Sequence, residues 1–206
     1  MKKRNRETRD LVLAMSIGDG CITSSGYLSF IHGKNQKEYL EWKIWLLHKY
    51  GITTTKVEEF NNNGYIGYRA RTYTHNFIKV FRRILYKPSK NIANRKMLNR
   101  LNALGIAIWY MDDGGLSQKK RNGVVHANEL MLNTGLSKEN NQIIIDYFKE
   151  VWNIKFNQYK NKGVYRLACG TKEARKFVEI VKPYVEQVPS MLYKINIKSL
   201  STTNNI

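Results

Sequence analysis

The chain shows two hydrophobic patterns in alternation, and the whole series occurs twice. The segments 11–19 and 104–113 are apolar almost throughout, which is typical of a helix that is buried on all sides. The segments 35–50 and 137–152 carry apolar residues at helical spacing, and a further segment of this kind closes each half. Between them, apolar and polar residues alternate around turn sequences such as "NNNG" and "NKG", which predicts β-hairpins.

The two halves are copies of one unit. "LVLAMSIGDGCI" (11–22) resembles "LGIAIWYMDDGGL" (104–116), and Asp19 in the first stretch matches Asp113, which lies 94 positions later. The hairpin and helix that follow match at an offset of 102. The second copy therefore holds eight additional residues, which fall in "LSQKKRNGVVHAN" and predict a longer hairpin.

These patterns predict an α+β fold of two pseudo-symmetric αββαββα repeats. The first repeat is expected at 1–87, with its apolar helix ending at Asp19. A basic linker is expected at 88–101, and the second repeat at 102–206, with its apolar helix ending at Asp113 and a C-terminal segment at its end. Each repeat should form an antiparallel sheet with helices on one face.

Strand alternation predicts which face of each sheet is free. Leu28 and Phe30 match Leu130 and Leu132, and these apolar side chains should face the covering helices. The opposite face is then rich in Lys, Arg, Asn, Ser and Tyr, which are side chains that contact phosphates and base edges. The alternative is that this face is simply the solvated side of an antiparallel sheet.

The charge favours a polyanionic partner. The chain has 35 Lys and Arg against 16 Asp and Glu, a net charge of +19. Residues 1–100 hold 20 basic and 7 acidic side chains and residues 101–206 hold 15 and 9, so the excess is not confined to a tail. Nucleic acid is the first candidate, an acidic membrane surface the second, and a merely soluble basic surface the third.

Other classes of protein are disfavoured. Two cysteines make neither a disulfide framework nor a zinc site, and the four histidines lack metal-ligand spacing. We expect no membrane span and no signal peptide, hence an intracellular protein. The charged start "MKKRNRETRD" is expected to be a solvated or phosphate-contacting arm.

The two apolar helices should bring their acidic ends together. Ala14 and Gly18 are four residues apart, which permits close approach of two helices. If the helices pack in parallel, Asp19 and Asp113 lie side by side, and two such carboxylates repel unless a cation or proton sits between them. Oxygen ligands of this kind suit Mg²⁺. The alternative is that Asp-Gly only makes a turn after each helix.

The motifs "VLAMSIGDG" and "IAIWYMDDG" resemble the two motifs of the LAGLIDADG homing endonuclease family in its single-chain, two-repeat form. The resemblance covers essentially the whole chain, although only the final Asp-Gly is kept in both copies. It implies two antiparallel sheets that form a DNA-binding saddle, with the motif helices packed at the repeat interface. It also implies that Asp19 and Asp113 are catalytic ligands of two or more divalent ions such as Mg²⁺, and that Gly18 and Asp112 offer backbone carbonyls to these metals.

Further similarity to the monomeric members of this family implies that two lysines lie near the metals. "SKNIANRKMLNRLNALGIAIWYMDDGG" resembles their linker and second motif, which places Lys90 23 residues before Asp113. "VPSMLYKI" resembles a segment near their C-terminus and gives Lys194. Such lysines are implied to polarise the phosphate or order the attacking water. A Pro of the family pattern is replaced by Ala93, and two ordinary surface lysines remain the alternative.

The resemblance implies a monomeric, site-specific endonuclease that cuts double-stranded DNA across the minor groove and leaves 3′ overhangs. The alternatives are a splicing maturase that acts on its own intron RNA, or a DNA-binding protein without cleavage. The Asn-, Lys- and Ile-rich composition suggests an intron of an organelle, bacterium or phage, and hence an organelle matrix or a bacterial or phage-infected cytoplasm. The residues expected to contact DNA are Ser24, Ser25, Tyr27, Ser29, Ile31, Lys56, Glu58, Arg69, Arg71, Tyr73, Lys119, Lys120, Arg121, Met131, Asn133, Lys155, Asn157, Tyr159 and Arg166.

Overall fold

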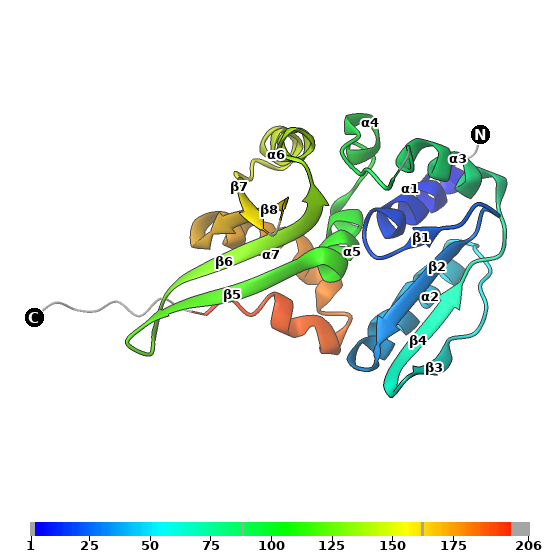
Figure 1. The fold of residues 1–206 in the computed structure, drawn as a ribbon, viewed down its shortest axis with the longest axis horizontal. Coiled ribbons are helices and arrows are strands. Elements are labelled where there is room, and N and C mark those ends of the chain that lie inside the picture. Colours follow the sequence, from blue (N-terminus) through cyan, green and yellow to red (C-terminus); the bar gives the residue numbers. More distant parts are fainter. Residues whose placement is uncertain (1–2, 88, 162, 199–206) are drawn as a thin grey trace, which may run out of the picture.

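The computed structural model describes residues 3–87, 89–161 and 163–198, and it contains the predicted element order twice. The two halves lie side by side, with helices α1 and α5 between two sheets (Figure 1). The first half comprises α1 (Lys3–Ile17), β1 (Cys21–Ile22), β2 (Leu28–Gly33), the short 3-10 helix η1 (Lys34–Gln36), α2 (Lys37–Lys49), β3 (Glu58–Asn62), β4 (Tyr65–Arg71) and α3 (Asn76–Leu85). The second half comprises α5 (Ala103–Asp113), β5 (Gly114–Arg121), β6 (Val124–Leu136), α6 (Lys138–Trp152), β7 (Asn157–Asn161), β8 (Val164–Gly170), α7 (Thr171–Val185) and the 3-10 helix η2 (Pro189–Lys194).

Each half forms a four-stranded antiparallel sheet of the same topology. The strand orders are β1-β2-β4-β3 and β5-β6-β8-β7, so corresponding strands occupy corresponding places. The predicted α+β fold of two αββαββα repeats is therefore confirmed. A short helix, α4 (Arg95–Leu98), lies between the halves, and Asn94 caps its N-terminus through its side-chain oxygen.

The hydrophobic core lies on the helix side of each sheet, as the alternation predicted. Leu28, Phe30, Leu130 and Leu132 are at most 1% exposed, whereas Ile31 on the other face of β2 is 61% exposed. The apolar helices α1 and α5 pack against each other at small side chains. A Cβ on Gly105 would lie 3.3 Å from the Ala14 Cβ, which is tighter than an ordinary contact, so glycine at this position lets the two helices approach closely.

The start of the chain was predicted incorrectly as an arm. From Lys3 onward it is the first part of α1, while residues 1–2 lie outside the described residues. Thr8 is buried and donates a hydrogen bond to the Tyr50 carbonyl, and an Arg100–Asp10 ion pair of 2.5 Å ties α1 to the segment after α4. Tertiary contacts of this kind stabilise a helix even in a highly charged segment.

The longer hairpin of the second half is present, and its basic residues lie within a strand. Lys119, Lys120 and Arg121 lie in β5 and pair with β6, with an irregularity in register between Lys119 and Lys120. Asn122 and Gly123 both have positive φ, at 50° and 78°, which is the two-residue turn that matches strand twist. Pairing therefore continues to the tip, and the three side chains have defined directions.

Candidate active site at the ends of the two central helices

The carboxylates of Asp19 and Asp113 line one depression of about 440 Å³. α5 ends at Asp113, whereas α1 ends at Ile17, two residues earlier than predicted. The Gly20 N–H closes α1 by donating to the Met15 carbonyl at 3.1 Å, so the chain leaves the helix just before Asp19. The remaining lining is Ile17, Gly18, Gly20, Cys21, Tyr86, Lys90, Ile92, Asn133, Thr134 and Leu136.

Both carboxylates are poorly neutralised. Burial raises the pKa of Asp19, and the nearby Asp112 carboxylate raises it further. Burial also raises the pKa of Asp113 to about 7, with additional contributions from Asp19 and Asp112. Lys43 and Lys90 oppose both shifts without cancelling them. The depression therefore holds an excess of negative charge that a cation would relieve.

Lys90 and Lys194 lie behind the two helix ends in corresponding places. Lys90 donates hydrogen bonds from its Nζ to the Gly18 carbonyl and, at 3.3 Å, to the Gly20 carbonyl. Lys194, the last residue of η2, donates to the Met111 carbonyl and contacts the Tyr110 carbonyl at 3.4 Å. Burial lowers the pKa of both lysines, and the surrounding carboxylates oppose that shift.

The side chain of Asp112 turns away from the depression into the first half. It is fully buried, and its Oδ1 lies 2.5 Å from Lys43 Nζ and 2.8 Å from Tyr39 Oη. Its Oδ2 accepts the Asp19 backbone N–H at 3.0 Å. These three donors occupy the carboxylate of Asp112. Only its backbone carbonyl remains as a possible metal ligand, which is the role suggested by the sequence.

Sequence reasoning missed the partners of Asp112. Tyr39 and Lys43 lie in the segment 35–50, of which only the helical spacing was noted, and His32 is one of the four histidines that lack metal-ligand spacing. Lys43 is 0% exposed. A lysine at a core position of an amphipathic helix was the sequence signal that could have indicated a buried partner for a carboxylate.

The donor set suits a hard divalent cation. Asp19 and Asp113 share the depression, whereas the Gly18 carbonyl, which the sequence suggested as a metal ligand, accepts a hydrogen bond from Lys90 Nζ. Oxygen ligands that are short of positive charge are what Mg²⁺ and Mn²⁺ prefer. Asp19 and Asp113 are therefore the residues that could hold such ions.

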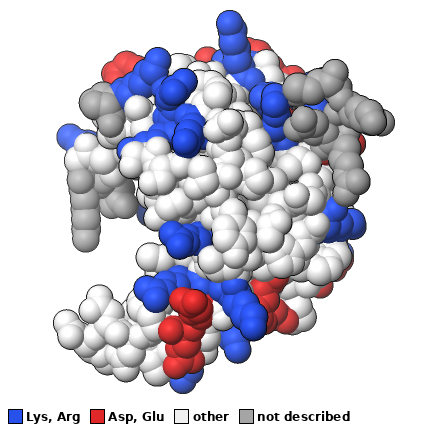
Figure 2. Space-filling view, turned by 90° about the vertical axis from the view of Figure 1, so that its right-hand side faces the viewer, with Lys and Arg blue, Asp and Glu red and all other residues white. Residues whose placement is uncertain are grey.

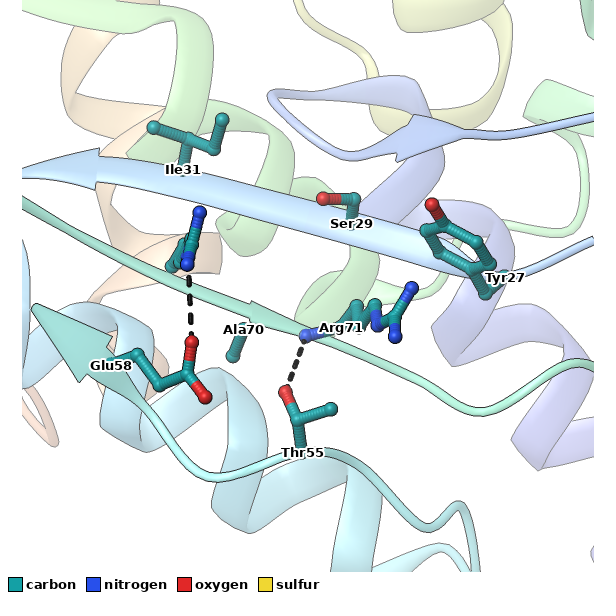
Figure 3. Close-up of a pocket in the computed structure, with 8 residues that line it drawn as sticks. Tyr27, Ser29, Ile31, Thr55, Glu58, Ala70 and Arg71 are labelled. Carbon is teal, nitrogen blue, oxygen red and sulfur yellow. Dashed lines mark hydrogen bonds and ion pairs between the residues drawn. The ribbon is translucent and has the colours of Figure 1, made fainter. Parts of the chain in front are cut away.

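On the outer face of the first sheet, the structure gathers many of the side chains expected to contact DNA. Tyr27, Ser29, Ile31, Glu58, Arg69 and Arg71 line a concavity of about 420 Å³, together with Thr55, which was not predicted, and Ala70 (Figure 3). Arg69 pairs with Glu58 at 3.4 Å, and the Arg71 guanidinium lies 4.7 Å from the Tyr27 ring centre. Four further residues expected to contact DNA are exposed and lie in the loops that flank these strands: Ser24, Ser25, Lys56 and Tyr73.

The second sheet presents a less uniform face. Tyr159 is 50% exposed and lies opposite Arg166 in the strand register, and the Arg166 Nε is buried without a hydrogen-bond partner among the described residues. Asn133 donates to the Asp113 carbonyl at 3.0 Å, which connects it to the Asp site rather than to the sheet surface. Lys119 pairs with Glu129 at 3.1 Å. Met131 is half-buried, and Lys155 and Asn157 are exposed.

The basic side chains are spread over the molecular surface. In a view of the end formed by the first half, Lys and Arg cover more of the face than Asp and Glu, and several of them border a hollow on its left-hand side (Figure 2). Among the described residues, no helix is long and apolar enough to cross a membrane.

Comparison with known proteins identifies related sequences and folds. The model of the LAGLIDADG DNA endonuclease family matches residues 12–177. "Probable intron-encoded DNA endonuclease 3" of Mycosarcoma maydis is 28% identical over 133 residues, which are 62% of this chain and 92% of that protein. "Probable intron-encoded endonuclease 1" of Wickerhamomyces canadensis is 31% identical over 171 residues, 77% of this chain and 69% of that protein. Several RecA proteins also match, and the chain spans less than half of their length.

The fold is shared with solved structures. That of the homing endonuclease I-WcaI bound to its DNA recognition sequence superposes with a TM-score of 0.77 and 22% identity, over 97% of this chain and 90% of that one. A more distant structure, of I-DmoI in complex with DNA and Mn, has a TM-score of 0.50 and 14% identity, over 85% of this chain and 96% of that one.

Proposed function

The chain belongs to the LAGLIDADG DNA endonuclease family, and on that premise we propose that it is a homing endonuclease that cuts both strands of a specific DNA site. The observation that carries the proposal is the placement of Asp19 and Asp113 in one depression, with the half-buried Lys90 and the buried Lys194 bound to carbonyls of the two helix ends. The repeats 1–87 and 102–206, joined by 88–101, would each supply one cleavage centre within a single monomeric chain.

Asp19 and Asp113 hold divalent ions, and the excess negative charge at the depression supports this assignment. A structure of I-DmoI contains DNA and Mn, and a divalent metal is implied by the family. A bound metal would act as a Lewis acid and activate the attacking water. Asp19 and Asp113 would hold the ions at the depression, and the surrounding basic surface would attract the DNA phosphates to them.

Lys90 and Lys194 place positive charge next to the two carboxylates. Each ammonium is held by backbone carbonyls at a helix end, so its position is fixed before DNA binds. A preorganised cation at the reacting phosphate stabilises the charge that develops on its oxygens during cleavage. Lys194 opposes the raised pKa of Asp19 more than Lys90 does, and Lys90 opposes the raised pKa of Asp113.

The sheet faces bind the DNA on either side of the cleavage centres. The concavity of the first sheet combines Arg69 and Arg71, which can contact guanine edges, with Tyr27 and Ser29, which can bind polar groups of bases or phosphates. The second sheet carries different side chains at the corresponding places, so the target is asymmetric. Cleavage across the minor groove between the two centres leaves 3′ overhangs.

A cleavage assay tests this proposal. The substrate is a duplex recovered by binding selection with the wild-type protein from a randomised library. We expect both strands to be cut at one position each in Mg²⁺ and to remain intact in EDTA, and end sequencing should give staggered 3′ overhangs. Binding without cleavage in Mg²⁺ or Mn²⁺ would instead favour a DNA-binding protein that has lost nuclease activity.

A further inference from the structure

A buried polar cluster joins the two halves next to Asp19. It consists of Lys43 and Tyr39 of α2, His32 of β2, and Asp112 of α5, and we call it the Lys43 cluster. The side chains of Lys43 and Asp112 are fully buried, and Tyr39 and His32 are 0% and 2% exposed. An ionic cluster at this depth is costly unless every member is paired, so its contacts decide its role.

Lys43 acts as a resident cation in this cluster. Its Nζ lies 2.5 Å from Asp112 Oδ1 and 3.3 Å from His32 Nε2. Oxygen and nitrogen atoms of Asp19, His32 and Asp112 lie within 4.8 Å of one another, a spacing that could hold a metal ion. The ammonium already supplies positive charge to Asp112 and His32, so these two residues have no need of a metal. The Asp19 carboxylate remains free to face the depression.

The contact with Lys43 also fixes the histidine tautomer. An ammonium group only donates hydrogen bonds, so His32 Nε2 must accept, and Nδ1 then carries the ring hydrogen. That Nδ1 lies 3.4 Å from Gln36 Oε1 and 3.9 Å from Asp19 Oδ2. The second distance exceeds a direct hydrogen bond, and a small rotation of the carboxylate would close it.

The cluster therefore reaches Asp19 from two directions. Asp112 Oδ2 accepts the Asp19 backbone N–H at 3.0 Å and fixes the main chain at the point where α1 has ended. His32 Nδ1, which is hydrogen-bonded to Gln36 Oε1 at 3.4 Å, lies 3.9 Å from Asp19 Oδ2. Tyr39 donates to Asp112 Oδ1 at 2.8 Å and keeps that carboxylate in place.

Among the described residues of the second half, no comparable ionic cluster surrounds Asp113, whose carbonyl instead accepts a hydrogen bond from Asn133 Nδ2 at 3.0 Å. At an offset of 102, Thr134 replaces His32, Asn141 replaces Tyr39 and Ile145 replaces Lys43. Thr134 Oγ1 donates to Asn141 Oδ1 at 2.6 Å, which gives an uncharged pair in place of the ionic cluster. The counterpart of Asp112 in the first motif is Gly18, which has no side chain to offer.

We propose that the Lys43 cluster is a positioning device for Asp19 alone, and that the two cleavage centres are consequently unequal. This inference rests on the proposed endonuclease function. His32 and Tyr39 are positioning residues, since they act on Asp19 directly or through Asp112. Loss of their contacts slows cleavage of the strand that Asp19 serves and spares the other, so nicked DNA accumulates.

Strand-specific rates test the inference. The substrate is the selected duplex with a different label on each strand, in Mg²⁺, and the measured quantity is the ratio of the two cleavage rate constants. This ratio is independent of the fraction of folded protein, because both strands are cut by the same molecules. The variants are His32→Leu, His32→Gln and Tyr39→Phe. The matched control in the second half is Tyr147→Phe, which removes a hydroxyl of α6 that accepts the Trp152 Nε1–H at 2.8 Å and does not line the depression. Asp19→Glu and Asp113→Glu, which displace one carboxylate each, define which strand each centre serves.

We expect His32→Leu to shift the ratio by about 10–100-fold, which is the usual effect of losing a group that orients a metal ligand. The shift should have the same direction as that caused by Asp19→Glu. Tyr39→Phe should shift it in the same direction. His32→Gln should restore most of the ratio, because an amide can accept from Lys43 and donate to Asp19. Tyr147→Phe should leave the ratio unchanged. The inference would be overturned if the ratio were unchanged in His32→Leu and Tyr39→Phe, or if it shifted in the direction given by Asp113→Glu. Cleavage of both strands by the wild type would still support the proposed function in that case. Absence of wild-type cleavage would overturn both.

Discussion

Gly18 and Asp112 are complementary across the interface of the two repeats. A Cβ on Gly18 would lie 2.1 Å from Asp112 Oδ2, closer than any two such atoms can approach. Glycine at one helix end thus makes room for the carboxylate of the other, and the pseudo-symmetric motifs differ at this position for a steric reason.

Gly18→Ala should therefore destabilise the protein by about 1–3 kcal/mol, the usual cost of inserting a methyl group into a packed site. It should also slow cleavage, because Asp112 can no longer hold the Asp19 N–H. Urea unfolding measures the first effect. Gly115→Ala is the control, since a Cβ there meets nothing within 4 Å, and equal destabilisation by both variants would contradict the steric explanation.

Lys43→Met should cost about 3–5 kcal/mol of unfolding free energy, because it leaves the buried Asp112 carboxylate without its cation. Adding Asp112→Asn should recover part of that loss, and a double-mutant cycle with the single variants measures the coupling. Glu150→Gln removes the exposed partner of Arg95 and should cost less than about 1 kcal/mol. A cycle that shows no coupling between Lys43 and Asp112 would contradict the cluster.

The fold was predictable from the sequence because the same pattern of helices and strands occurs twice in the chain. Both apolar helices, their acidic ends and the alternating strands recur in one order, so each copy supports the interpretation of the other. The Lys43 cluster could not be predicted in this way, since it exists in one copy only. Helical periodicity places Lys43 on the buried face but cannot distinguish a buried ammonium from one that extends to solvent.

Two other details could not be predicted from the sequence. α1 ends before Asp19 because the Asp19 N–H is bound by Asp112, a residue 93 positions away that no local pattern could indicate. Lys119–Arg121 lie in a strand because the Asn122–Gly123 turn lets pairing run to the tip of the hairpin. The assignments of individual DNA contacts remain predictions.

Asp113→Asn should stabilise the metal-free protein more at pH 8 than at pH 4.5. The pKa of Asp113 is raised to about 7 from a usual value of 3.8, so the folded state binds more protons than the unfolded state between these values. Stability contributed by this group falls as pH rises through that window, and the loss is complete above about pH 7. Melting temperatures of both proteins in EDTA measure the difference, and a difference that does not change with pH would contradict it.

Mg²⁺ should offset the destabilisation that the ionised Asp113 carboxylate causes in the wild-type protein. At pH 8 the metal should raise the melting temperature, because it binds the ionised carboxylates of the folded state. The effect should be smaller at pH 5.5, where protons compete for Asp113, and smaller in Asp113→Asn at either pH. Equal stabilisation of wild type and variant would place the metal elsewhere.

Arg166→Ala should relax sequence preference at one or two base pairs of one half-site, since a bidentate contact to guanine is worth about 1–3 kcal/mol. Alanine at Lys119, Lys120 and Arg121 together should weaken binding to all sequences and reduce the salt slope by up to about three units. Cleavage profiles over randomised target libraries distinguish the two effects. If the hairpin variant changed base preference while Arg166→Ala changed only affinity, the assigned roles of these side chains would be reversed.

The central claim is that Asp19 and Asp113 are the metal-binding catalytic residues, and single substitutions to asparagine test it most directly. Cleavage of the selected duplex in Mg²⁺ and binding to it in EDTA are measured for Asp19→Asn and Asp113→Asn alongside the wild type. We predict that each variant loses double-strand cleavage and keeps most of its DNA affinity, because each carboxylate holds metal rather than bases. Robust cleavage of both strands by either variant would contradict the account.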